Sequence, residues 1–240
     1  MNETTLQKMT QMKLFGMQNA FQSILETKQY HSLNNDELLA MLLQAEWEER
    51  ENKKIKRYLH QAHFRYQASV EEIDFTHPRN LDKTQLLRFT DCAFIERSEN
   101  ILICGPTGAG KSFLVSALGN QACVKGFKVI YFNTQKLFAL LKMSKADGSY
   151  LREMNKIERS NLLIIDDFGL QPLDAQNRLT LMEIIEDRHG KMSTIISSQL
   201  PVAKWYEIIG ESSLADAIMD RLVHTAHRLE LKGDSMRKKS

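Results

Sequence analysis

The stretch of sequence that decides the fold is ILICGPTGAGKS, residues 101–112. Four apolar residues are followed by the spacing Gly-x-x-x-x-Gly-Lys-Ser over Gly105–Ser112. Glycine adopts backbone angles that are barred to other residues, so a loop of this kind can curl with its N–H groups pointing inward around a phosphate. The pattern predicts a nucleotide-binding loop, and the plainer alternative is an ordinary glycine turn between a strand and a helix.

The residues around this loop favour nucleotide binding. A helical pattern follows the loop, at Phe113, Leu114, Ala117, Leu118 and Ala122. Lys111 would place a positive charge near the β- and γ-phosphates, the Ser112 hydroxyl would bind Mg²⁺, and the helix that starts near Gly110 would add its positive end. We therefore expect ATP and Mg²⁺ as cofactors. The predicted nucleotide contacts are Gly105, Pro106, Thr107, Gly108, Ala109, Gly110, Lys111, Ser112 and Phe113.

Composition narrows the class of protein. The 240 residues carry a formal net charge of +2, which is too small to indicate a nucleic-acid partner by itself. Cys92, Cys104 and Cys123 have neither metal-ligand nor redox spacing, which is typical of reduced thiols in a cytosol. The first residues form no apolar signal segment, and no run approaches the ~20 apolar residues of a membrane span. We expect a cytoplasmic protein without a membrane partner.

The first part of the chain has helical periodicity and no strand pattern. Apolar residues recur every three or four positions in two series, Leu6–Leu25 and Leu38–Ala62. Asn34 and Glu37 have the spacing of a capping box, which would start the second series. The apolar stripe weakens near residue 50, so the sequence leaves open whether one continuous helix spans this region.

From about residue 80 onward, strand patterns alternate with helical ones. Short apolar runs predict five strands, at 101–104, 128–132, 161–166, 193–198 and 226–231. Strands that are buried on both faces and separated by helices form a parallel sheet with helices on each side. Too few residues follow the fourth strand for a helical lid after the fifth. We expect an α/β fold of the P-loop NTPase class over residues 76–240, without a C-terminal lid. A small all-helical domain for DNA or oligomer contacts precedes it, over residues 1–75.

Two carboxylates stand at the end of the third expected strand. Leu162–Ile165 form an apolar run, and Asp166 and Asp167 follow it. Ligands of a parallel sheet bind at the carboxyl ends of its strands, so Asp166 would hold Mg²⁺ through water while Ser112 binds the metal directly. Asp167 would polarise the attacking water. The alternative is a strand that happens to end in an acidic turn.

Further polar residues suit ATP hydrolysis in an assembly. The fourth strand ends where many oligomeric ATPases place a side chain that contacts the γ-phosphate or the water, and both Ser198 and Gln199 qualify. Arg221, near the end of an expected helix, would either reach the γ-phosphate of a neighbouring subunit or pair locally with an acid. Arg237 in the basic tail is another candidate phosphate contact. The predicted catalytic residues are Lys111, Asp166, Asp167, Gln199 and Arg221.

Positive charge gathers in two stretches of the chain. The first contains Lys53, Lys54, Lys56, Arg57 and Arg65, and the second contains Lys142, Lys145 and Arg152. Basic residues interleaved with aromatic ones are typical of surfaces that contact a nucleic-acid backbone, although the solvated face of any long helix has a similar composition. No pattern indicates readout of base edges. We expect sequence-independent binding to double-stranded DNA through at least one stretch.

Taken together, these segments resemble the IstB-like ATPases, which act beside the transposase in one family of bacterial insertion sequences. The resemblance covers nearly the whole chain and rests on Phe94–Arg97, Leu162–Gly169, Ser193–Pro201, Leu214–Leu222 and His227–Arg237. IstB-like ATPases are similar to DnaC-type helicase loaders within the AAA+ superfamily. The resemblance implies an AAA+ ATPase that forms homo-oligomers on target DNA and recruits and stimulates the transposase. It also implies that Arg221 is the intersubunit arginine.

Two departures from the wider superfamily affect the expected mechanism. The second carboxylate is usually Glu but is Asp167 here, and the lid is missing. Both favour a slow switch over a fast motor. The alternative function is that of a DnaC-type replicative helicase loader, which would bind a hexameric helicase instead of a transposase. A small-molecule kinase would need a closing lid with arginines and an acceptor pocket, and the sequence supplies neither.

Overall fold

In the computed structural model, residues 2–28, 33–224 and 226–236 are described. Arg237 lies outside these ranges. The chain forms two compact units, Met1–Arg57 and Tyr58–Ser240. Within the described ranges, every helix is too short or too polar to pass through a membrane.

The first unit consists of helices. They are α1 (Asn2–Gln11), α2 (Phe15–Thr27) and the greater part of α3 (Asn35–Ala62), which is a single uninterrupted helix. The predicted capping box is confirmed at the start of α3. Asn34 Oδ1 accepts a hydrogen bond from the Glu37 N–H, and Glu37 Oε2 accepts one from the Asn34 N–H, both at 2.9 Å.

α2 approaches α3 closely at Gly16. A Cβ on Gly16 would lie 2.3 Å from the carbonyl oxygen of Ala45, so the two backbones leave no space for a side chain there. Glu46 Oε2 accepts hydrogen bonds from the N–H groups of Gly16 and Met17, which are otherwise unpaired in the first turn of α2. Burial opposes the ionisation of Glu46, but hydrogen bonds from Arg50 and from these N–H groups lower its pKa below the ordinary value.

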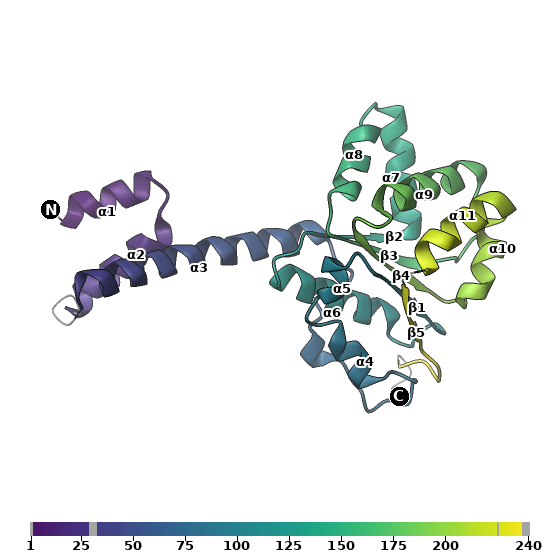
Figure 1. The fold of residues 1–240 in the computed structure, drawn as a ribbon, viewed down its shortest axis with the longest axis horizontal. Helices are drawn as coiled ribbons and strands as arrows, with labels where there is room; N and C mark the ends of the chain where they lie inside the picture. The colour runs from purple at the N-terminus through teal and green to yellow at the C-terminus, as the bar shows by residue number, and fades with distance from the viewer. Residues whose placement is uncertain (1, 29–32, 225, 237–240) are drawn as a thin grey trace. The chain divides into compact units, whose positions relative to one another are not determined.

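The second unit is built on a five-stranded parallel sheet. The strands are β1 (Asn100–Cys104), β2 (Val129–Asn133), β3 (Leu162–Phe168), β4 (Ser193–Ser198) and β5 (Ala226–Glu230). Their order across the sheet is β2-β3-β4-β1-β5 (Figure 1). Each predicted strand is confirmed to within two residues at either end. This order brings the carboxyl ends of β1, β3 and β4 to adjacent positions on one edge of the sheet.

Helices cover both faces of this sheet (Figure 1). One face packs against η2 (Val70–Glu72), α4 (Lys83–Arg88), α5 (Ala93–Glu96) and α6 (Lys111–Val124). The other packs against α7 (Thr134–Ala146), α8 (Tyr150–Glu158), α9 (Ala175–Arg188), η3 (Val202–Lys204), α10 (Trp205–Ile209) and α11 (Ser212–Val223). Ile101 and Ile103 of β1 pack in the first core, whereas Leu102 and Cys104 pack in the second. Because both faces are buried, the strand has a continuous apolar sequence.

The segment before β1 contributes to the core on the α6 side. Ala68, Val70 and Ile73 are buried there together with residues of α6 and the sheet. The domain boundary near residue 75 stays a prediction, while these residues pack within the second compact unit. After β5, the described residues up to Met236 form no helix.

Arg188 connects several segments near the amino ends of the strands. Its side chain is fully buried, and its guanidinium donates to the carbonyl oxygens of Ile157, Ser160 and Ser193 and to the hydroxyl groups of Ser160 and Thr194. Burial lowers the pKa of Arg188 to about 9. These hydrogen bonds connect the end of α9 to the end of α8 and to the start of β4.

Candidate nucleotide site

The glycine-rich loop lies between β1 and α6 and ends in a left-handed cap. Gly110 is the N-cap of α6 with φ of 88°, a conformation that favours glycine, and the helix begins at Lys111. The Lys111 ammonium donates to the carbonyl oxygens of Gly105 and Pro106, at 2.8 and 2.9 Å. The loop therefore wraps around its own lysine, and the amino end of α6 adds a partial positive charge at the same place.

Two segments from elsewhere in the chain pack on the loop. A Cβ on Gly108 would lie 2.0 Å from Ser235 Oγ, and the Met236 N–H donates to the Gly108 carbonyl at 3.0 Å. Arg79, which is almost completely buried, donates from Nη1 to the Ala109 carbonyl at 2.9 Å. Sequence reasoning missed Arg79 because nothing in its local pattern distinguishes it from a polar linker residue. These contacts hold the loop against the segment before β1 and the segment after β5.

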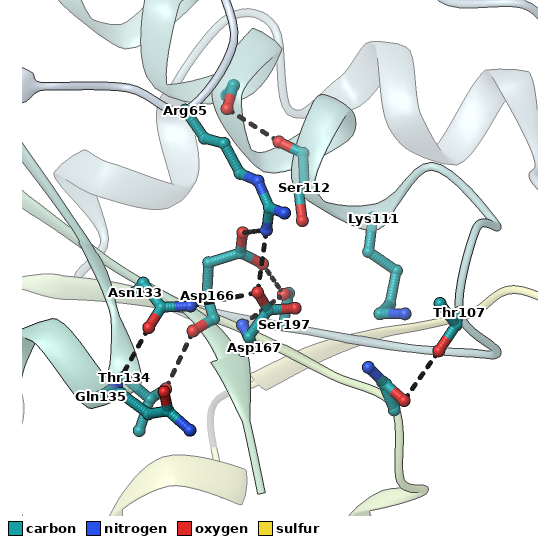
Figure 2. Close-up of polar contacts among 12 residues, drawn as sticks. Arg65, Thr107, Lys111, Ser112, Asn133, Thr134, Gln135, Asp166, Asp167 and Ser197 are labelled. Atoms are coloured by element: carbon teal, nitrogen blue, oxygen red, sulfur yellow. Dashed lines mark hydrogen bonds and ion pairs between the residues drawn. The ribbon is translucent and has the colours of Figure 1, made fainter. Parts of the chain in front are cut away.

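Asp166 ends the fully buried part of β3, as predicted. The phenol of Tyr131 on β2 donates to Asp166 Oδ2 at 2.5 Å. The Ser197 hydroxyl on β4 donates to Asp166 Oδ1 (Figure 2). The side chain of Asp166 is completely buried. Burial and the Asp166 charge raise the pKa of Tyr131, so its phenol stays protonated and acts as a donor. Two neighbouring strands thus fix the orientation of this carboxylate.

Asp167 turns away from regular strand geometry. Its φ is 58°, in the left-handed region, and the pairing of β3 with β4 shifts register between Ile165 and Phe168. Its carboxylate accepts hydrogen bonds from Asn133 Nδ2 at 3.1 Å and from Arg65 Nη1 at 2.8 Å (Figure 2). A non-glycine residue in this conformation is strained, and such strain is found mostly where a side chain is aimed for function.

At the end of β4, Ser198 and Gln199, which the sequence left as alternatives, make different contacts. The Ser198 hydroxyl donates to the Phe168 carbonyl and accepts from the Leu200 N–H, so it completes the strand end. Gln199 instead reaches the loop, where its Oε1 accepts a hydrogen bond from the Thr107 hydroxyl at 2.8 Å. Of the two, Gln199 is the residue that contacts the loop, and its contact with the γ-phosphate stays a prediction.

A cavity of about 350 Å³ joins these parts. Its lining includes Arg65, Thr107, Gly108, Gly110, Lys111, Ser112, Phe113, Asp167 and Gln199. Six of the nine predicted loop residues, one of the two carboxylates and the γ-phosphate candidate therefore lie around one space, whereas Gly105, Pro106 and Ala109 are not among its lining residues. Arg65 was expected in the first basic stretch, and its contact with the carboxylates was not foreseen.

The oxygen atoms at this site suit a hard divalent cation. Mg²⁺ in nucleotide enzymes is bound by one or two carboxylates together with substrate phosphates and water, rather than by a cage of protein ligands. Asp166 and the Ser112 hydroxyl supply donors of this kind, and Arg65 is the cation paired with Asp166 and Asp167 in this structure. Among the described residues, no group of three or more His, Cys, Asp or Glu side chains forms a separate metal site.

Comparison with known proteins decides the family. The profile of the family described as IstB-like ATP binding protein matches residues 7–240. The chain belongs to this family. An insertion sequence ATP-binding protein of Sinorhizobium fredii is 44% identical to this IstB-like protein over 98% of the chain and 96% of the relative. The predicted family is therefore confirmed.

Solved structures of similar fold are AAA+ proteins of DNA replication. AMPPCP-bound DnaA from Aquifex aeolicus superposes with a TM-score of 0.60, at 16% identity, over 73% of this chain and 53% of that one. The DnaC helicase loader gives 0.57, at 22% identity, over 74% and 99%. At these identities the likeness shows the fold alone. Together with the family, it confirms the prediction of a P-loop ATPase fold of the AAA+ type.

Arg221 of the IstB-like protein lies far from its own loop. The side chain of Asn100, the first residue of β1, donates to the carbonyl oxygens of Arg221 and Leu222. The glycine-rich loop follows the last residue of β1, roughly 13 Å further along the strand. Arg221 Nε pairs with Glu186 Oε2 of α9 at 2.5 Å. Local pairing with an acid is thus present, and an intersubunit role stays a prediction.

The two basic stretches are partly neutralised within the chain. Lys53 pairs with Glu49 at 3.0 Å, and Lys54 pairs with Glu51 at 3.3 Å. In the second stretch, the Lys145 ammonium lies 4.4 Å from the centre of the Tyr150 ring and Arg152 pairs with Glu153. Lys142 lines a groove that also includes Asp167. Contact with DNA by Lys53, Lys54, Lys56, Arg57, Lys142, Lys145 and Arg152 stays a prediction.

Proposed function

We propose that this IstB-like protein hydrolyses ATP with Mg²⁺, assembles on double-stranded DNA, and in its ATP-bound form recruits and stimulates a transposase. The observation that carries the proposal is the convergence of Lys111, Ser112, Asp167 and Gln199 on one cavity, in a chain of the IstB-like family. The names of its relatives connect this family with insertion sequences.

The chain's own groups would act on the nucleotide as follows. The loop N–H groups and the Lys111 ammonium would bind the β- and γ-phosphates, and Lys111 would exchange its carbonyl partners for phosphate oxygens. Ser112 and Asp166 would hold Mg²⁺, which when bound neutralises charge on the phosphoryl oxygens. Asp167, oriented by Asn133, would position the attacking water, and Gln199 would contact the γ-phosphate.

Completion of the site requires a second copy. Arg221 stands at the opposite edge of the sheet from the loop, so it is poorly placed to serve its own nucleotide. A head-to-tail contact would place it beside the γ-phosphate of a neighbour, where an arginine stabilises transition-state charge. Hydrolysis would then depend on assembly, and DNA would promote it by bringing copies together.

The insertion-sequence relatives favour a transposase over a helicase as partner. The resemblance to the DnaC helicase loader, at 22% identity, extends to the fold alone, whereas the Sinorhizobium fredii relative is 44% identical along nearly the whole chain. A helicase loader remains the alternative outcome of a binding experiment that offers both partners.

The proposal is tested by measuring DNA affinity and ATP hydrolysis in parallel. Fluorescence anisotropy with two duplexes of unrelated sequence is expected to give equal affinities, higher with ATP than with ADP. Affinity should fall steeply between about 50 and 200 mM salt, because binding releases counterions from the DNA backbone. Duplex DNA should stimulate hydrolysis, and Asp167→Asn should keep the DNA-bound state but stop turnover.

Equal affinity for DNA with ATP and with ADP, together with a hydrolysis rate that does not change when DNA is added, would contradict the proposal. Capture of a hexameric helicase in place of an insertion-sequence transposase would favour the alternative.

A further inference from the structure

The Arg65 guanidinium lies beside the two carboxylates at the end of β3, Asp166 and Asp167. Arg65 Nη1 lies 2.8 Å from Asp167 Oδ2 and 3.7 Å from Asp166 Oδ2, and Figure 2 shows its side chain directed at both. Within the described ranges, Arg65 is the cation paired with these two carboxylates. Two adjacent carboxylates repel each other, and the Arg65 charge offsets this repulsion.

The chain around Arg65 is anchored while its side chain has room to move. Phe64 packs edge-on against Tyr131, with ring centres 6.2 Å apart, and Tyr66 packs against Phe113 at 6.3 Å. Between these anchors the Arg65 side chain is 41% exposed. It lines both the loop cavity of about 350 Å³ and a larger cavity of about 1100 Å³ along β2. The guanidinium can therefore leave the carboxylates without unpacking its neighbours.

A purely structural role explains this arrangement poorly. The Arg65 side chain is 41% exposed, so solvent screens its charge and the long side chain loses rotamer freedom when it is held, which reduces what the pair contributes to folding. Its geometry is instead specific, since one donor reaches two carboxylates from strand β3. Any other cation that binds those carboxylates therefore competes with Arg65.

We propose that Arg65 is a placeholder cation, which occupies the carboxylate pair in the nucleotide-free protein and is displaced when Mg²⁺ enters with ATP. This inference rests on the proposed function, because it takes Asp166 as the carboxylate that holds the metal and Asp167 as the neighbouring carboxylate that positions the attacking water. A divalent ion and a guanidinium a few ångströms apart repel strongly, so the two occupants exclude each other. The triphosphate supplies the negative charge that receives the displaced guanidinium. Metal without nucleotide consequently binds weakly.

The test is Mn²⁺ binding to the full-length protein, followed by electron paramagnetic resonance, with Mn²⁺ in place of Mg²⁺. Without nucleotide, Arg65→Gln is expected to bind Mn²⁺ about tenfold more tightly than the wild type, because the competing charge is gone. Arg65→Lys should fall between the two, because it keeps the charge on a single, shorter-reaching donor group. Arg159→Gln removes the same charge from an exposed position just after α8, near the amino edge of the sheet, and should match the wild type. With ATP present, the difference between wild type and Arg65→Gln should shrink.

The outcomes separate this inference from the proposed function. Thermal melting within a few degrees of the wild type establishes that each variant is folded. If Arg65→Gln binds Mn²⁺ no more tightly than Arg159→Gln, or if neither binds it without nucleotide, Arg65 is not a placeholder and the inference is overturned. Asp166→Asn tests the metal site itself, with ATP present. If that variant keeps wild-type Mn²⁺ affinity in the presence of ATP, the assignment of Asp166 is wrong, and the proposed function fails along with the inference.

Discussion

Mixing two inactive variants tests whether Arg221 acts on a neighbouring subunit. Arg221→Ala leaves the loop and both carboxylates intact, and Asp167→Asn leaves the arginine intact. An arginine that acts in trans contributes about 10³-fold or more to hydrolysis, so each variant alone should be almost inactive. ATP binding should persist in both, because neither change touches the loop or Lys111.

The activity of the mixture follows from the geometry of a head-to-tail contact. A working site needs a loop and carboxylates from an Arg221→Ala copy and an arginine from an Asp167→Asn copy on the correct side. In a random equal mixture about one contact in four meets this condition. The mixture should therefore recover about a quarter of the wild-type rate, against almost none for either variant.

The local partner of Arg221 is weak enough to be replaced. Arg221 and Glu186 are partly exposed, with side-chain exposures of 26% and 53%. Exposed pairs of this kind contribute less than about 1 kcal/mol, so a neighbour's phosphate can compete for the arginine. Glu186→Gln should accordingly leave the recovery of activity in place.

The assay is steady-state phosphate release with duplex DNA, at protein concentrations where light scattering shows assembly. Varying the proportion of the two variants at constant total protein should give a rate that is highest near the equal mixture and falls on either side. A mixture whose rate equals the sum of its parts would show that Arg221 does not complete a neighbour's site. Normal hydrolysis by Arg221→Ala alone would have the same meaning.

Three further substitutions test the packing around the site and in the first unit. Tyr131→Phe removes the phenol that donates to Asp166. Because a hydrogen bond to a charged group contributes about 1.5–3 kcal/mol, kcat should fall by about tenfold or more. The Kd for ATP should be unchanged. Arg188→Met leaves three carbonyl oxygens without their donor, so the unfolding free energy in urea should fall by about 3 kcal/mol or more, with no specific effect on nucleotide binding. Glu46→Gln should lower the thermal stability of the helices of the first unit at neutral pH. Because folding lowers the pKa of Glu46, the wild-type advantage should be lost as the pH falls through that pKa, as followed by circular dichroism. An advantage that persisted at acid pH would show that the Glu46 charge is not its source.

The parts of the site that sequence alone predicts are those with local rules. The spacing Gly105–Ser112 is dictated by backbone angles around a phosphate, and Asp166 follows a buried apolar run that needs no partner to be recognised. For the same reason, the bounds predicted for the five strands agree with the structure to within two residues. Gln199 was one of two candidates, and only the hydrogen bond with Thr107 distinguishes it from Ser198.

The parts that sequence did not predict come from distant positions in the chain. Arg65 meets Asp167 across 102 positions, and Tyr131 meets Asp166 across 35. Arg65 stands among basic residues near the end of a long helix, where its local pattern indicates a surface charge. Tyr131 stands within the apolar run of β2, where its local pattern indicates a core residue. Such contacts depend on the order of strands and on the path taken before β1, and neither follows from periodicity.

The cations that would act on ATP are each held by another part of the same chain. Lys111 is held by carbonyl groups of its own loop, Arg65 by the carboxylate pair, and Arg221 by Glu186. Phosphate carries more charge than the carbonyl groups that hold Lys111 or the exposed carboxylate that holds Arg221, and the metal would repel Arg65 from the carboxylate pair. Binding of ATP with metal would exchange the first two, and assembly would exchange the third. Hydrolysis would therefore begin only after nucleotide and neighbour are both in place, which is the order that a switch on DNA requires.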